Sequence, residues 1–207
     1  KLKEFYSLMF HSRDIKKEML QQFISGKKIP KESLNELKNI RNLLRGIPKQ
    51  DEKYLLKFGK NNTIKLDLTY EIKELEKDII YVESGKDSFL DYLANIHKEF
   101  NEQVDLGCEL LGKVEKLNFI TDRDGTVNNY CGRYASSIQS IYNAMFLWEF
   151  ACTRAKNSVI LTSAPLEDIG LADISIFPPG YFIYAGAKGR KYIDMQGKRK
   201  QYLIKAE

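Results

Sequence analysis

The sequence predicts an α + α/β fold, with a helical bundle over residues 1–114 and an α/β domain with parallel strands over residues 115–207. Two observations support this division. The first half is rich in Lys, Glu and Leu, and its apolar residues recur every three or four positions, as in amphipathic helices. The second half has short apolar runs separated by a long helical pattern, an order that is typical of parallel strands joined by helices.

The first half is predicted to form helices that pack against one another in antiparallel fashion. Pro30 lies near the first turn of the second helix, and Gly46 follows its last apolar residue. Ile64, Leu66 and Leu68 alternate as in a strand, but the Glu/Lys pattern after them favours a helix. Ser84-Gly85 is expected to break the chain before the last helix, whose inward side chains include Phe100, Val104 and Cys108. The expected helices cover residues 1–25, 30–45, 51–58, 63–82 and 87–111.

The second half begins with a predicted buried strand that contains Leu117, Phe119 and Ile120. A helix over residues 136–156 follows, and Val159–Leu161 is expected to form a parallel strand after a right-handed crossover. Parallel strands end at the same edge of the sheet, so Thr162 or Ser163 should lie near Asp122 and Asp124. Further expected elements are a loop with a short helix at 166–176, a strand at 181–184, and a hairpin of residues 191–194 and 200–204.

The composition favours a soluble globular protein that is intracellular. The chain is 43% hydrophobic and 29% charged, with a net charge of +5. Its Lys and Glu residues are interleaved, which suits solvated helix faces better than a nucleic-acid surface. A polyanion site on the basic C-terminal residues is an alternative, but a hairpin with solvated faces is the preferred interpretation. Three cysteines at irregular spacing predict neither a disulfide framework nor a zinc site, so we expect a cytoplasmic protein.

Other sites and locations are disfavoured by residue type and position. The two histidines, His11 and His97, are far apart and far from the aspartates, so a histidine triad or histidine-rich metal site is not expected. The most apolar run, residues 141–152, is too short to span a bilayer and contains Glu149. The sequence therefore predicts no membrane span and no signal peptide.

The motif Asp122-Arg123-Asp124-Gly125-Thr126 follows the first predicted strand and carries the candidate chemistry. Ligand sites in open α/β sheets form at the carboxyl ends of strands. An ionised Asp122 carboxylate can attack phosphorus and form an aspartyl-phosphate. Repulsion between neighbouring carboxylates favours a proton on one of them, which suits Asp124 as general acid and then base.

A phosphate dianion would be repelled by two carboxylates, so a divalent cation is needed, and Mg²⁺ suits this site. Asp122 and Asp124 are the expected metal ligands. Gly125 allows a tight turn under the phosphate, and the hydroxyl of Thr162 is expected to bind phosphate oxygens. A calcium loop fails on spacing, because Gly125 is fourth and Arg133 twelfth from Asp122. An ordinary turn stays open as an alternative, although the strand context favours a phosphate site.

The segments Phe119–Thr126 and Val159–Thr162 resemble the first two motifs of the haloacid dehalogenase superfamily of phosphotransferases. Further segments are similar to the trehalose-6-phosphate phosphatase family with a helical N-terminal extension: Asn129-Tyr130-Cys131, Tyr134-Ala135, Leu161–Leu166 and Gly186–Arg190. The resemblance implies the first part of a Rossmann-like haloacid-dehalogenase core. It also implies Asp122 as nucleophile and Mg²⁺ ligand, Asp124 as acid/base that binds Mg²⁺ through its carbonyl, and Thr162 as phosphate ligand.

The resemblance implies an enzyme, a phosphomonoester hydrolase that acts on a sugar phosphate, most simply trehalose 6-phosphate. Arg123 stands where that family usually has an aromatic residue. The family's cap domain, lysine motif and later acidic pair are not visible up to Glu207. We therefore expect either a fragment of a phosphatase or a degenerate relative. In the second case the protein is a non-catalytic interaction or oligomerisation protein whose N-terminal helices bind a protein partner or a second copy.

Overall fold

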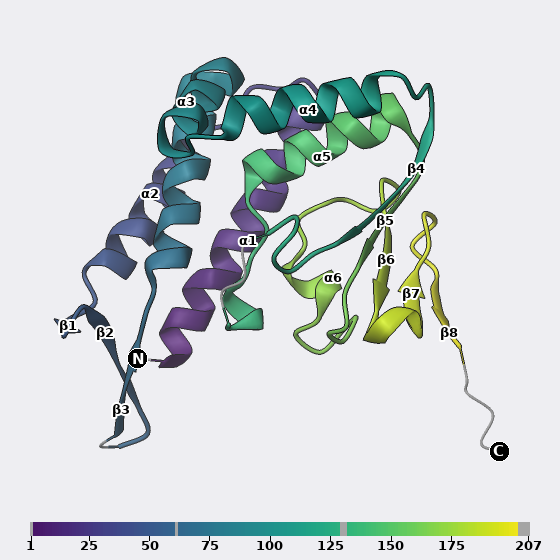
Figure 1. The fold of residues 1–207 in the computed structure, drawn as a ribbon. Coiled ribbons are helices and arrows are strands. Elements are labelled where there is room, and N and C mark those ends of the chain that lie inside the picture. Colours follow the sequence, from purple (N-terminus) through teal and green to yellow (C-terminus); the bar gives the residue numbers. More distant parts are fainter. Residues whose placement is uncertain (1, 61, 129–131, 203–207) are drawn as a thin grey trace.

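The computed structural model describes residues 2–60, 62–128 and 132–202 (Figure 1). The predicted α + α/β fold is confirmed: a helical region precedes a mixed sheet with parallel strands. The first half contains α1 (Leu2–Ile24), α2 (Lys31–Arg45), β1 (Lys49–Gln50), β2 (Lys53–Phe58), β3 (Asn62–Leu66), α3 (Thr69–Ile96) and α4 (Phe100–Gly112). The second half contains β4 (Leu117–Asp122), α5 (Ile141–Arg154), β5 (Ala155–Leu161), α6 (Leu171–Ile174), β6 (Ile183–Gly186), β7 (Lys191–Ile193) and β8 (Arg199–Gln201).

The first two helices form where the apolar periodicity predicts them. Met19 and Leu20 of α1 are fully buried, and so are Leu37 and Leu44 of α2. The N–H of Gly46 donates to the carbonyl of Asn42 (2.9 Å) and ends α2 in a tight turn. Burial of these apolar stripes against α3 and α5 supplies the main stabilisation of both helices.

The helix predicted over residues 51–58 is wrong, because this segment is strand β2 of a three-stranded antiparallel meander. Tyr54 and Leu56 point to the same face and are 5% and 1% exposed, as the two-residue period of a strand requires. The β1–β2 turn takes positive φ at Asp51 (50°) and Glu52 (61°), the geometry of a tight hairpin that usually uses Asn-Gly. Because Asp51-Glu52 stands in place of that dipeptide, the sequence does not indicate a hairpin here.

The helix boundaries predicted between residues 63 and 111 are also corrected. Residues 62–66 pair with β2 as strand β3 and are not helical. The alternation of Ile64 and Leu66 therefore indicated a strand, and the Glu/Lys pattern after them belongs to the next helix. Helix α3 then runs from Thr69 to Ile96, and the break expected at Gly85 is a kink in which this residue takes a φ of 81°. The chain leaves helical geometry at His97 instead, before α4 begins.

Helix α4 does not bury the side chains that were expected to point inward. It has no buried residue, and Val104 is 45% exposed. Phe100, Val104 and Cys108 line one side of an apolar groove between α4 and α5 instead. The pattern therefore predicted an amphipathic helix correctly but not its burial.

The second half forms a five-stranded sheet in the order β4-β5-β6-β7-β8. Strands β4, β5 and β6 are parallel, whereas β7 and β8 are added as an antiparallel hairpin, as predicted around Gln196–Lys198. Helix α5 is shorter than predicted at both ends, because it begins at Ile141 and residues 155 and 156 already belong to β5. Ile120 was expected to be buried, but β4 is an edge strand and this side chain is 63% exposed.

Helix α5 joins the two halves, since both α1 and α3 pack against it (Figure 1). Phe89 of α3 and Tyr142 of α5 lie with ring centroids 4.8 Å apart. The core is therefore continuous between the halves, and the division into residues 1–114 and 115–207 stays a prediction. Within the described residues, no helix has the length and apolar composition needed to cross a membrane. Both histidines lie at the surface, and Cys108 and Cys152 are free thiols.

Candidate functional site

The site is built where β4 ends and the chain turns sharply. Asp122 is the last residue of β4, beside Leu161 of β5. The carbonyl of Arg123 accepts hydrogen bonds from the N–H groups of Val127 (3.1 Å) and Asn128 (2.9 Å). Gly125 has a φ of 86° and donates to the carbonyl of Asn128 (2.7 Å). This positive φ explains why glycine suits the turn that presents the two aspartates.

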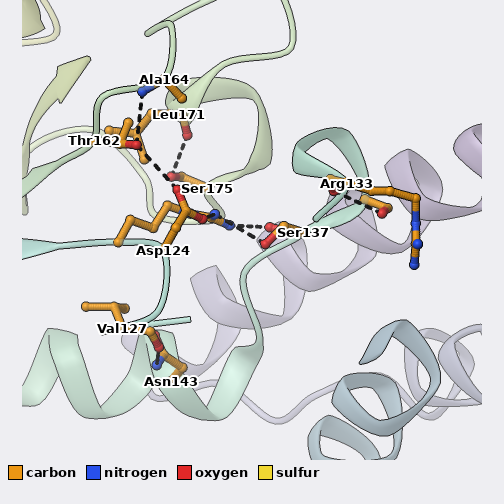
Figure 2. A network of polar contacts seen from close by, with 11 residues as sticks. Asp124, Val127, Arg133, Ser137, Asn143, Thr162, Ala164, Leu171 and Ser175 are labelled. Atoms are coloured by element: carbon orange, nitrogen blue, oxygen red, sulfur yellow. Dashed lines mark hydrogen bonds and ion pairs between the residues drawn. The ribbon is translucent and has the colours of Figure 1, made fainter. Parts of the chain in front are cut away.

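The parallel pairing of β4 and β5 brings Asp124 and Thr162 together, as expected for two strands that end at one edge. The Thr162 hydroxyl donates to Asp124 Oδ2 (3.3 Å) and accepts from the N–H of Ala164 (3.2 Å) (Figure 2). Thr162 is 3% exposed, and its N–H donates to the carbonyl of Ala185 (2.9 Å). The hydroxyl is thus held in place beside the carboxylate.

Arg123 is buried directly behind the aspartates and was not predicted as a site residue. Its guanidinium pairs with the Asp124 carboxylate and donates to the Ser137 carbonyl, and it also donates to Ser137 Oγ (3.2 Å). It lies 5.5 Å from the centre of the Tyr134 ring. The sequence did carry a signal for this role, because Arg123 stands between two aspartates at the end of a strand. An arginine that is buried there requires hydrogen-bond acceptors nearby.

A cavity of about 360 Å³ opens at this edge of the sheet. Asp122 is exposed there, whereas the Asp124 side chain is only 20% exposed. No Lys or Arg stands among the described residues that line the cavity. The lining residues are Asp122, Asp124, Gly132, Tyr134, Ser137, Thr162, Ser163 and Ala164. The described lining therefore offers carboxylates and hydroxyls to a ligand.

Tyr134 is one of the residues that line the cavity. Burial raises the pKa of its hydroxyl to about 12, and the nearby Asp124 carboxylate acts in the same direction, against the opposing effect of Arg123. The hydroxyl is buried beside the Thr162 side chain, whose hydrogen bond acts to lower this pKa. A neutral tyrosine hydroxyl can donate, so it offers a further polar contact to a bound ligand.

The predicted site residues lie together: Asp122, Asp124 and Thr162 line the one cavity, and Gly125 makes the turn beneath it. Sequence reasoning did not single out Tyr134 or Ser137 for the site, because they come from a 3-10 turn at Tyr134–Ser136 and the residue after it. Their approach depends on long-range packing. The segment Asn129-Tyr130-Cys131 lies outside the described residues.

A metal ion would find two carboxylates here. Among the described residues, no group of three or more His, Cys, Asp or Glu side chains converges at metal-binding distance. Mg²⁺ commonly binds through one or two carboxylates together with waters and substrate phosphate. The donor set of Asp122 and Asp124 therefore fits Mg²⁺ and does not fit a closed zinc site.

Two family models match this chain. Residues 119–207 match the model described as trehalose-6-phosphate phosphatase, C-terminal, and residues 1–104 match its N-terminal helical bundle domain. The two matches together cover the candidate site and the helices that precede it.

Curated relatives from nematodes support the same similarity. The alpha,alpha-trehalose-phosphate synthase [UDP-forming] 2 of Caenorhabditis elegans is 29% identical over 95% of this chain and 17% of its own length. The trehalose-phosphatase of Brugia malayi is 32% identical over 58% of this chain and 24% of its own length. The trehalose-phosphatase of Caenorhabditis briggsae is 24% identical over 92% of this chain and 51% of its own length. The chain thus spans from about a sixth to a half of these relatives.

Proposed function

Because the chain belongs to the trehalose-6-phosphate phosphatase family, we propose that it forms part of a phosphatase that hydrolyses a sugar phosphate, most simply trehalose 6-phosphate to trehalose. The proposed enzyme is Mg²⁺-dependent and of the haloacid dehalogenase type. The observation that carries the proposal is the convergence of Asp122, Asp124 and Thr162 on one cavity at the ends of parallel strands.

Asp122 is the nucleophile in this proposal. Its carboxylate is exposed to the cavity, and the structure gives it no ion pair with any described residue. One carboxylate oxygen attacks the phosphorus of the sugar phosphate, and the bond between phosphorus and the sugar oxygen breaks. The product of this step is an aspartyl-phosphate on Asp122 and a free sugar.

Asp124 is the general acid and then the general base in this proposal. It gives a proton to the departing sugar oxygen and later takes one from the water that attacks the aspartyl-phosphate. The second attack releases inorganic phosphate and restores the Asp122 carboxylate. The Thr162 hydroxyl, 3.3 Å from Asp124, is suited to donate to a phosphate oxygen during both steps.

Asp122 and the backbone carbonyl of Asp124 would hold Mg²⁺, and the Asp124 carboxylate is the other acidic group at the site. When bound, the ion neutralises charge on the phosphate. The exposed Asp122 carboxylate would repel a phosphate dianion, which supports a need for this charge. Partners of the helical half are left open by this proposal.

The test is phosphate release from trehalose 6-phosphate by the natural full-length protein. Asp122→Asn should abolish release, because an amide cannot attack phosphorus, while the melting temperature should change little at this exposed position. Asp105→Asn, at an exposed position of α4 far from the cavity in sequence, is the matched control and should retain full activity. Undiminished release by Asp122→Asn would contradict the proposal.

The second candidate function is a non-catalytic interaction or oligomerisation protein with a degenerate phosphatase-like domain. The observation that favours it is α4, which buries none of its residues and exposes Leu106, Leu110 and Leu111. This reading predicts no rise in melting temperature on addition of Mg²⁺, since only a ligand that binds the native state stabilises it. A rise that is lost in Asp122→Asn would exclude it.

A further inference from the structure

Helix α3 presents three buried carboxylates to the second half of the molecule. Glu71, Glu74 and Asp78 are 1%, 6% and 0% exposed, and their spacing of three and four residues places them on one face of the helix. Burial of a carboxylate is costly unless it is paired, so each needs partners. Glu74 accepts from the Tyr142 hydroxyl (2.8 Å), and Asp78 accepts from the N–H of Ile141 (2.6 Å). Both of these contacts hold α5.

Glu71 differs from the other two because its partners in the second half, Arg133 and Ser136, lie before α5 in the chain. The Arg133 guanidinium donates to both Glu71 carboxylate oxygens (2.7 and 2.9 Å), and the Ser136 hydroxyl donates to one of them (2.7 Å). Arg133 also donates to the carbonyl of Asp67. Arg133 and Ser136 are the two ends of the 3-10 turn, because the N–H of Ser136 donates to the carbonyl of Arg133 (3.1 Å). Glu71 therefore clamps this turn from both ends.

The clamped turn leads directly into the candidate site. Ser137 follows Ser136 in the chain, and its carbonyl and hydroxyl both accept from Arg123. The same guanidinium donates to Asp124. Arg123 and Ser137 are each 2% exposed, so no bulk water competes for these hydrogen bonds. Figure 2 shows Arg133, Ser137 and Asp124 along this path.

We infer that Glu71 is a positioning residue for Asp124, acting through Arg133 and Ser136, then Ser137 and Arg123. The helical half thereby completes the site rather than serving only as an attachment. The inference rests on the proposed function, because the position of Asp124 matters for catalysis only if this residue transfers the protons.

The physical reason is that the rate of proton transfer is sensitive to the position of the carboxylate. A misplacement of about 1 Å can cost roughly a hundredfold in rate, so a carboxylate that acts on a leaving oxygen needs a fixed orientation. Asp124 has two such restraints, the Arg123 guanidinium on Oδ1 and the Thr162 hydroxyl on Oδ2. Loss of the Glu71 clamp would free Ser137, and Arg123, which Ser137 holds, would then no longer keep Asp124 Oδ1 in one orientation.

The test compares Glu71→Gln with Glu74→Gln in the natural full-length protein, assayed on trehalose 6-phosphate. Both changes neutralise a buried carboxylate on the same face of α3, and both lower stability. Glu71→Gln should reduce kcat about tenfold to a hundredfold with little change in KM, since the substrate still binds. Glu74→Gln should keep the wild-type kcat. Equal kcat values in the two variants overturn the inference.

A second measurement does not require turnover. Nitrogen-15 NMR of the Arg123 guanidinium should show separate, slowly exchanging Nη signals in the wild type and in Glu74→Gln, and averaged signals in Glu71→Gln. If Glu71→Gln does not fold, Ser136→Ala removes one hydrogen bond of the clamp and should cause the same changes to a lesser degree.

The outcomes separate the two proposals. An active wild type with no difference between Glu71→Gln and Glu74→Gln overturns the positioning role alone. A wild type that releases no phosphate overturns the proposed function, and the Arg123 signals then decide whether Glu71 fixes this guanidinium. Unaltered Arg123 signals in Glu71→Gln overturn the inference in either case.

Discussion

Gly125 makes the turn after Asp124 with a backbone that other residues rarely adopt. Its φ is 86°, and a Cβ built there would meet nothing within 4 Å. Gly125→Ala should therefore lower the free energy of unfolding by about 1–2 kcal/mol from backbone strain alone. Gly107→Ala in the exposed helix α4 is the matched control and should raise it by about 0.5–1 kcal/mol. Chemical denaturation measures both, and equal effects of the two changes would contradict the argument.

Gly186 is required for a different reason, because two segments of backbone approach closely. A Cβ at this position would lie 2.6 Å from the Leu166 nitrogen, in the loop that follows Thr162. Since backbone atoms cannot move aside as a flexible side chain can, Gly186→Ala should displace this loop. We expect a larger loss of stability than for Gly125→Ala, together with weaker phosphate binding. A variant as stable as the wild type by denaturation would show that the loop adjusts.

The Asp78 carboxyl makes the free energy of unfolding depend on pH. Burial raises the pKa of Asp78 from 3.8 to about 6, because the loss of water disfavours its charge more than the neighbouring Lys16 ammonium favours it. Between pH 4 and 6 the folded chain then binds more protons than the unfolded chain. The contribution of this group to the free energy of unfolding therefore falls as the pH rises through this window.

Asp78→Asn tests this direction. Near pH 7, where Asp78 of the wild type is ionised, the substitution leaves the buried Lys16 charge without its carboxylate, so it should destabilise the fold by about 3–5 kcal/mol. The difference in free energy of unfolding between wild type and variant should become smaller from pH 4 to pH 6, because only the wild type carries the titrating group. Denaturation curves at several pH values measure this. A difference that grows with pH would mean that Lys16 outweighs the effect of burial.

At the scale of elements, α4 and α3 have similar sequence patterns but different surroundings. Leu110 of α4 is 64% exposed, whereas Leu75 of α3 is fully buried. Leu75→Ala should cost about 2–5 kcal/mol of stability, because it leaves a cavity in the core. Leu110→Gln should change stability by less than about 0.5 kcal/mol. Thermal or chemical denaturation distinguishes these outcomes, and a large cost for Leu110→Gln would show that α4 is covered in solution.

The elements that sequence reasoning predicted well have a strong period and clear end signals. Helices α1 and α2 have long apolar stripes, with Gly26 and Pro30 between them. The β1–β2–β3 meander was missed because its strands are short and exposed on one face, and the Asp51-Glu52 turn lacks glycine. The end of α3 was predicted too early because the helix continues past the Gly85 kink. Side chains are buried both before the kink, as at Tyr81, and after it, as at Phe89, and no local sequence pattern reveals this packing.

The candidate site divides in the same way. Asp122, Asp124 and Thr162 were found because two strand ends and the rule for parallel sheets place them together. Ser137 and Tyr134 were missed because they reach the cavity through a turn that Glu71 holds from another part of the chain. Contacts between residues some 65 positions apart follow from the tertiary fold and have no periodic signature in the sequence.

At the scale of the whole molecule, the two halves share one core. Beyond the Glu71 clamp, Lys16 of α1 and Asp78 of α3 form a buried ion pair (2.8 Å) beside the start of α5. Arg13 of α1 donates to the carbonyl of Asp173 in α6 (2.9 Å). Separation of the halves would leave Glu71 without the Arg133 guanidinium and Asp78 without the N–H of Ile141, so buried carboxylates of α3 depend on both halves.

The halves should therefore unfold together. Trp148 of α5, the single tryptophan of the chain, reports on the second half through fluorescence. Far-UV circular dichroism reports mainly on the helices of the first half, which hold most of the helical residues. Coincident denaturation curves from the two probes are expected for one cooperative unit. Asp78→Asn weakens the shared interface, so its two curves should separate if the coupling depends on these buried charges. Separate curves in the wild type would instead mean that the helical half folds independently, which would deprive Glu71 of a fixed frame from which to hold the site.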